Sequence, residues 1–188
     1  YVTGILDASL TAAPCTDVND DGSLTVADAA LIAHCHQAHV LADSSLIDTR
    51  CSFPLLDMVN IYDSVTFTIG AFDLGAGYLD VHVRNPNRKL VGYELRFSGI
   101  TITGVDNLAD PMDFPIVPAF NGNTAHVIGL SYVDSLFERH NGFTPLFRVH
   151  FVNPANMICI DQVVDVMNED YAAPLTFLVD ACVFSTAV

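Results

Sequence analysis

The chain has 188 residues, of which 51% are hydrophobic and 15% charged, a composition that excludes an intrinsically disordered protein. Its formal net charge of -15 excludes nucleic acid and anionic membranes as partners and favours divalent cations. No apolar run approaches the roughly 20 residues of a membrane-spanning helix, so membrane insertion is not expected. Because the chain begins with tyrosine, we expect a secreted or cell-surface protein whose targeting segment has been removed.

The first feature in chain order is an acidic loop, residues 17–28, with the sequence DVNDDGSLTVAD. Calcium takes about six to eight oxygen ligands, and a loop of about 12 residues supplies them from its first, third, fifth, seventh, ninth and twelfth positions. These positions hold Asp17, Asn19, Asp21, Ser23 (through its backbone carbonyl), Thr25 (directly or through water) and Asp28. Gly22 occupies the sixth position, where the chain must bend sharply. The loop therefore predicts a Ca²⁺ site, since a solvated turn that merely caps a helix does not explain this coincidence of residue types.

A helix is predicted directly after the loop, from Val26 to about His39. Ala27, Ala30, Leu31 and His34 recur with the spacing of one helical face, and alanine is the strongest helix former. Asp28 lies in the predicted first turn, where a negative charge favours the helix dipole.

Five cysteines are present, and no two of them form a C-x-x-C pair; they are Cys15, Cys35, Cys51, Cys159 and Cys182. In a secreted protein this number predicts two disulfides and one further thiol, and a reduced cytosolic protein is the alternative. The motif HCHQAH also places Cys35, His36 and His39 at spacings that a zinc or copper ion can use. We favour a disulfide at Cys35 and solvent-exposed histidines.

From about Ser64 onward, apolar and polar residues alternate in short runs that are separated by Asn, Gly, Pro and Asp clusters. The apolar faces predicted from this alternation are Val65, Phe67 and Ile69; Leu79, Val81 and Val83, opposite Asp80, His82 and Arg84; and Val91, Tyr93, Leu95 and Phe97. The pattern predicts a mainly β fold, a jelly roll or β-sandwich of about eight or nine strands. We expect residues 1–50 to hold the calcium loop and helix and residues 64–188 to form the sandwich, with residues 51–63 as the connection between them.

The loop and helix together resemble a dockerin repeat over residues 15–39, through the pattern D-x-N-x-D-G-x-L-T-x-x-D followed by a helix. The resemblance implies an extracellular calcium module that binds a partner sandwich called a cohesin. The chain carries one such copy where dockerins carry two. Val26 and Ala27 stand at the positions that hold a serine–threonine recognition pair in some members.

The β region resembles a cohesin over about residues 64–184. The resemblance rests on GYLDVHVRNPNRKLVGYELRFSGITITGV (77–105) and GFTPLFRVHFV (142–152), and carbohydrate-binding modules share the same architecture. It implies a partner of the cohesin or dockerin type, or a second copy of the chain.

No nucleophile elbow, zinc-protease motif or phosphate loop occurs, so we expect a protein that is not an enzyme and has no catalytic residues. The hypothesis is an extracellular structural protein in which the calcium-stabilised helix docks on a sandwich, which can be that of the next molecule, so that the molecules join head to tail in a fibre. Another route to assembly is open: the first residues, YVTGILDASLT, can donate a strand to a neighbour. The alternative is a carbohydrate-binding or adhesion module of a larger secreted system, with glycans as its partners.

Overall fold

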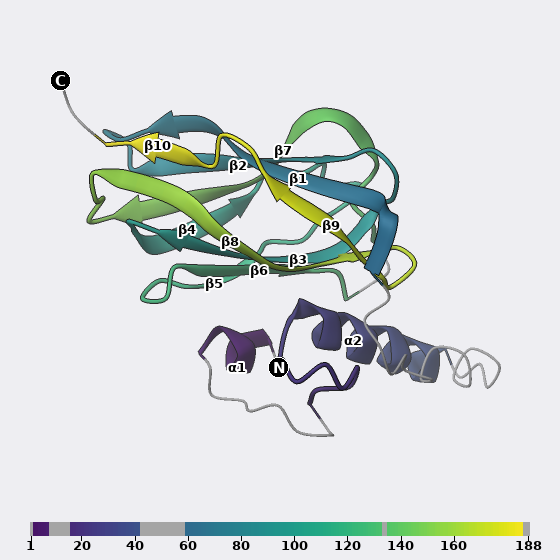
Figure 1. The fold of residues 1–188 in the computed structure, drawn as a ribbon. Helices are drawn as coiled ribbons and strands as arrows, with labels where there is room; N and C mark the ends of the chain where they lie inside the picture. Colours follow the sequence, from purple (N-terminus) through teal and green to yellow (C-terminus); the bar gives the residue numbers. More distant parts are fainter. Residues whose placement is uncertain (1, 8–15, 42–58, 133–134, 186–188) are drawn as a thin grey trace.

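The computed structural model describes residues 2–7, 16–41, 59–132 and 135–185. Within these ranges ten strands form two sheets of five strands each, which lie face to face, and two helices lie on the outside of one sheet (Figure 1). The elements are α1 (Val2–Leu6), α2 (Val26–Val40), β1 (Val59–Asp73), β2 (Tyr78–Asn85), β3 (Leu90–Ser98), β4 (Thr101–Asn107), β5 (Ala119–Asn121), β6 (His126–Leu130), β7 (His140–Val152), β8 (Met157–Asn168), β9 (Ala173–Leu178) and β10 (Cys182–Phe184). Among the described residues no helix is both long and apolar enough to span a membrane.

The strand order is β4-β7-β2-β1-β9 in the first sheet and β10-β8-β3-β6-β5 in the second. All neighbours are antiparallel except β1 and β9, which are parallel. The predicted β-sandwich is therefore confirmed, with ten described strands in place of the expected eight or nine. Strand β1 begins at Val59, inside the segment 51–63 that the sequence analysis assigned to the connection.

The space between the two sheets holds the main hydrophobic core. The predicted alternation is confirmed for β1 and β2, whose inward residues are all buried there: Val65, Phe67, Ile69, Leu79, Val81 and Val83. From the facing sheet, Tyr93 stacks on Phe147 with ring centroids 5.3 Å apart. Burial of these large side chains is the main source of stability for the sandwich.

Val91 departs from the predicted pattern. The sequence analysis placed it on the same face as Tyr93, Leu95 and Phe97, which line the main core. Val91 instead belongs to a second apolar cluster on the outer face of its sheet. The pairing of β3 with β8 shifts register between Leu90 and Gly92, and a one-residue slip exchanges the two faces of a strand.

The second cluster lies between the helices and the outer face of the sheet β10-β8-β3-β6-β5 (Figure 1). Its buried members are Ile5, Leu6, Val26, Ala27, Ala29, Ala30, Val91, Ile128, Leu130 and Met167. Helix α2 confirms the helix predicted from Val26, and its alanines allow close approach to the sheet. Strand donation by residues 1–11 was an open alternative; of this segment, Val2–Leu6 form helix α1 and bury Ile5 and Leu6 in this cluster, and residues 1 and 8–11 lie outside the described residues.

A disulfide joins Cys159 of β8 to Cys182 of β10, residues that face each other directly in the ladder. It ties the edge strand β10 to its sheet. Cys35 is also disulfide-bonded, whereas Cys15 and Cys51 lie outside the described residues, so the prediction of a remaining thiol is not tested.

Candidate calcium loop and helix-docking interface

The acidic loop is folded around its first residue. The two carboxylate oxygens of Asp17 accept hydrogen bonds from the backbone N–H groups of Asp21 at 3.1 Å and Gly22 at 3.0 Å. Gly22 has φ +84°, the left-handed conformation that glycine adopts without steric cost. Asn19 donates to Asp21 Oδ2 at 2.9 Å, so three of the predicted ligands lie together on the inside of one tight turn.

Asp28 closes the loop from the first turn of helix α2. Its side chain is fully buried and accepts hydrogen bonds from the backbone N–H groups of Val18 at 2.8 Å and Thr25 at 3.0 Å. Burial raises the pKa of Asp28, the negative charge of Asp21 raises it further, and the backbone donors partly oppose the rise. Burial is the largest cause of the raised pKa, and the charge of Asp21 is a smaller cause that a nearby cation would offset.

The side chain of Thr25 faces the sheet. Its hydroxyl donates to Asp165 Oδ2 at 2.6 Å and accepts from the N–H of Ala27 at 3.2 Å. The Thr25 hydroxyl is thus engaged with Asp165, and the other predicted donors are the oxygens of Asp17, Asn19, Asp21 and Asp28 and the carbonyl of Ser23, a hard oxygen set without nitrogen or sulfur.

The loop carboxylates are held by the N–H groups of their own chain. Across the described ranges, no three His, Cys, Asp or Glu side chains converge closely enough to hold a metal ion. The calcium site therefore stays a prediction, and the donor set of the loop is what supports it.

Two carboxylates from the sheet meet the N-terminus of helix α2. Glu94 Oε2 on β3 accepts from the N–H of Val26 at 2.8 Å, and Asp165 Oδ2 on β8 accepts from the N–H of Ala27 at 3.2 Å. The first N–H groups of a helix have no partners within the helix and carry a partial positive charge, so anionic side chains stabilise them. The sheet thus provides capping groups for a helix that lies far from it in sequence.

Glu94 is in turn held by His126 on the neighbouring strand β6. Glu94 Oε1 and His126 Nε2 lie 2.7 Å apart, and the two side chains are 1% and 2% exposed. Both oxygens of the buried carboxylate therefore have a donor, one from the sheet and one from the helix. This arrangement fixes the position at which the helix begins on the sheet.

Asp165 lies in a less favourable place for a charge. Desolvation by burial raises its pKa to about 6, against the hydrogen bonds from Thr25, Val166 and Ala27, and the charge of Glu94 contributes to the rise. At neutral pH the interface therefore holds two adjacent carboxylates under one helix N-terminus, and its electrostatics depend on pH.

The sequence analysis did not identify Glu94, His126 or Asp165. A single polar residue in an alternating strand is the ordinary pattern of a sheet with one face exposed to water, so nothing marked Glu94 as buried. The contact joins residues 68 positions apart for Val26 and Glu94 and 140 apart for Thr25 and Asp165.

At the histidine-rich end of α2, the structure bears on the metal alternative only through Cys35. Cys35 is disulfide-bonded and so does not offer a thiolate. The ring of His34 packs against the ring of Tyr171, with centroids 3.9 Å apart. This contact joins the middle of the helix to the loop after β8.

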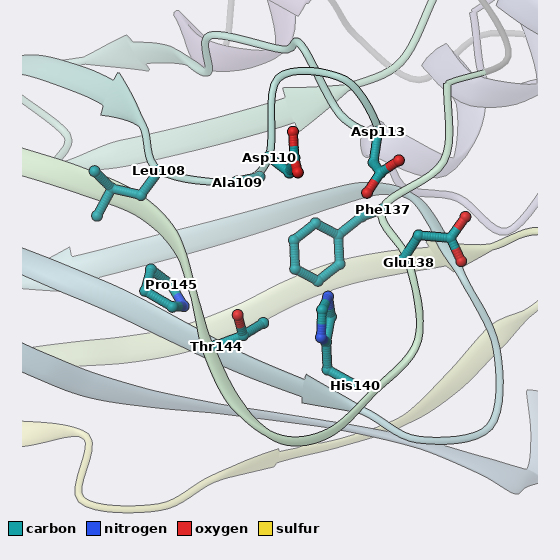
Figure 2. A pocket seen from close by; sticks show the side chains of 9 residues that line it. All are labelled: Leu108, Ala109, Asp110, Asp113, Phe137, Glu138, His140, Thr144 and Pro145. Atoms are coloured by element: carbon teal, nitrogen blue, oxygen red, sulfur yellow. The ribbon is translucent and has the colours of Figure 1, made fainter.

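A cavity of about 160 Å³ lies at one end of the sandwich, and its wall includes the acidic residues Asp110, Asp113 and Glu138 (Figure 2). Two of its acidic side chains have local partners. Asp110 accepts from the N–H of Met112 at 2.9 Å, and Glu138 pairs with Lys89 at 2.5 Å. The rings of Phe137 and His140 lie 5.1 Å apart in the same wall.

No protein-family model and no curated protein sequence matches the chain. Two solved structures with similar folds are the third ScaB cohesin of R. flavefaciens in complex with a group 1 dockerin and a non-cellulosomal cohesin of the hyperthermophilic archaeon Archaeoglobus fulgidus. The first is 16% identical with a TM-score of 0.47 and covers 66% of this chain and 96% of that one. The second is 14% identical with a TM-score of 0.42 and covers 62% of this chain and 91% of that one.

Proposed function

We propose that this chain is an extracellular, non-enzymatic assembly module in which a calcium-stabilised loop and helix docks on the β8-β3-β6 face of a β-sandwich. The observation that carries the proposal is the capping of the N-terminus of α2 by Glu94 and Asp165. A helix held only by apolar contacts can slide or rotate on a sheet. Charged groups at its first residues fix its position and give the contact the specificity of a recognition site.

The docking interface is separable from the core of the sandwich. The second apolar cluster includes no member of the core between the sheets. The loop and helix precede β1 in the chain, and residues 42–58 stand between them in the sequence. We infer that the same helix can dock on the sandwich of a second chain, since exchange of an identical element between protomers needs no new contact. Repeated head-to-tail exchange produces a filament.

Calcium is proposed as the structural cofactor, held by Asp17, Asn19, Asp21, Asp28 and the carbonyl of Ser23. When bound, it supplies positive charge that offsets the buried carboxylates. The loop leads directly into Thr25 and Val26, so the geometry of the loop sets the direction in which the helix meets Glu94. Besides a second copy, we propose a protein of the cohesin or dockerin type as partner, on the basis of the sequence resemblance.

A complementation experiment tests transfer of the helix between chains. Gly92 lies beneath the helix, and a Cβ atom there would stand 3.0 Å from Val26 Cγ2, so Gly92→Leu blocks the sheet while leaving the helix intact. Ala30→Asp places a charge in the buried helix face while leaving the sheet intact. We expect a 1:1 complex when the two variants are mixed in millimolar calcium, measured by size-exclusion chromatography with light scattering.

Gly142→Leu is the matched control, because nothing lies within 4 Å of a Cβ atom at that position. When the Gly142→Leu chain is mixed with the Ala30→Asp chain, no complex should form, because the helix of Gly142→Leu stays docked on its own sheet. If the Gly92→Leu and Ala30→Asp chains fail to associate at high concentration, the helix serves only its own chain and the assembly proposal is wrong.

Sedimentation of the unmodified protein, with millimolar calcium and with chelator, tests the role of the metal in assembly. We expect larger ordered particles in calcium that disperse on chelation, seen also by electron microscopy. A monomer under both conditions would contradict assembly by this route.

A further inference from the structure

A groove crosses the outer face of the sheet β4-β7-β2-β1-β9. This sheet carries neither of the described helices (Figure 1). Its volume is about 450 Å³. It is lined by Ser64 and Thr66 of β1, Arg84 of β2, Phe143 of β7, and Phe177 with the apolar end of β9. The groove runs across the strands and not along them.

The lining residues form one transverse row. Thr66 is paired with Arg84 on one side and with Phe177 on the other, and the Arg84 guanidinium lies 5.7 Å from the centre of the Phe143 ring. Adjacent strands are about 4.8 Å apart, so the row spans roughly 14 Å from β7 to β9. The rings at its two ends, Phe143 and Phe177, are 44% and 50% exposed.

Arg84 has no carboxylate partner among the described residues, although the chain has 22 acidic residues. Arg148 on the same face is held by both oxygens of Asp80, at 2.6 and 3.0 Å. The hydroxyls of Ser64 and Thr66 likewise make no hydrogen bond to any described residue. The middle of the row thus offers the Arg84 guanidinium and the partly exposed Ser64 hydroxyl as donors, with Thr66 buried between them, and its ends offer apolar rings.

We propose that this groove binds a neutral polysaccharide chain. A pyranose ring has an apolar face of C–H bonds, which suits the phenyl rings, and a rim of hydroxyl oxygens, which suits the guanidinium and hydroxyl donors. The net charge of -15 opposes a polyanion. An extended peptide would gain main-chain hydrogen bonds from a strand edge, which a groove across the strands does not present.

The test is affinity electrophoresis of the full chain in gels containing hydroxyethyl cellulose, xylan, mixed-linkage β-glucan or galactomannan, with polygalacturonate as the charged arm. We expect retardation by at least one neutral polymer. Arg84→Ala and Phe177→Ala should each weaken it roughly ten-fold. The matched control is Phe184→Ala, which removes an equally apolar ring that is 69% exposed on β10, in the other sheet, and should leave retardation unchanged.

Binding lost in both groove variants and kept in Phe184→Ala supports the proposal. Retardation by polygalacturonate alone, by none of the polymers, or equally in the wild type and both groove variants overturns it. The experiment uses the monomeric fraction of each protein, and the groove lies on the sheet opposite the helix-docking face. Its outcome is therefore independent of the assembly proposal.

Discussion

The carboxylate of Glu94, in the middle of β3, accepts a hydrogen bond from the backbone N–H of Val26, the first residue of helix α2, at 2.8 Å. This bond joins the helix to the sheet beside the apolar cluster that the two share. It also places a negative charge at the positive end of the helix, in a position from which water is nearly excluded.

Removing the buried carboxylate of Glu94 should therefore lower the free energy of unfolding more than removing an exposed carboxylate. We expect Glu94→Ala to lower the free energy of unfolding by about 3–5 kcal/mol, because it leaves His126 and the Val26 N–H without their partner. Urea denaturation of Glu94→Ala, His126→Ala and the double variant should show strong coupling, with the double variant costing less than the sum.

Glu138→Ala is the control for that series, since Glu138 forms an ion pair with Lys89 at the surface and should cost no more than about 1 kcal/mol. Equal effects of the Glu94 and Glu138 changes would show that the helix is not anchored through Glu94.

Asp165 should make the stability depend on pH. Its folded pKa is about 6, above the ordinary 3.8, so the folded state holds the proton more tightly than the unfolded state. Stability from this group is therefore greatest below pH 4, falls as the pH rises from about 4 to about 6, and stays constant above. A pKa difference of one corresponds to about 1.4 kcal/mol, which sets an upper limit of about 3 kcal/mol.

The measurement is urea denaturation of the wild type and Asp165→Asn from pH 4 to pH 7. The difference in unfolding free energy between the two proteins isolates the contribution of Asp165 from that of the other carboxylates. From pH 4 to pH 7 the wild type should lose more stability than Asp165→Asn. A constant difference across the interval would show that Asp165 keeps an ordinary pKa.

Calcium should raise the melting temperature of the wild type, because an ion that binds only the folded state adds stability. At a concentration about 100 times the dissociation constant, the gain is about 2.7 kcal/mol. Asp17→Asn and Asp21→Asn should each remove most of this gain. Asp110→Asn, which changes an acidic residue in the wall of the 160 Å³ cavity and outside the loop, is the charge-matched control and should keep the gain. A calcium response unaltered in both loop variants would place the ion elsewhere.

The disulfide between Cys159 and Cys182 should stabilise the edge strand β10. It closes a loop with a sequence separation of 23, for which the loss of chain entropy in the unfolded state corresponds to about 3 kcal/mol. Replacing both cysteines by serine should lower the midpoint of thermal unfolding under oxidising conditions. Adding a reductant to the wild type should lower the midpoint by a similar amount. An unchanged midpoint in both experiments would show that the cross-link does not stabilise β10.

Local patterns in the sequence were sufficient for several of the elements, though not for helix α1 or for the start of β1 at Val59. The helix from Val26 follows from residues that are neighbours along the chain, and so does the turn at Gly22, which has the positive φ that its position in the loop requires. The alternation in β1 and β2 was equally readable, because the period of a strand places every second residue on the buried face. These features depend on backbone geometry over a few residues.

The tertiary structure decided where these elements meet. The register shift in β3 turned Val91 away from the core, and no local rule fixes which pair of strands accommodates a bulge. The partners of the helix N-terminus, Glu94 and Asp165, come from strands that are distant in sequence and adjacent only because β3 and β8 pair. From the sequence alone, a carboxylate in an alternating strand is assigned to the exposed face, and only the packing of a helix over that face shows that it is buried. For that reason the sequence determined the loop, the helix and the sandwich, and only the packing of one on the other determined the docking interface.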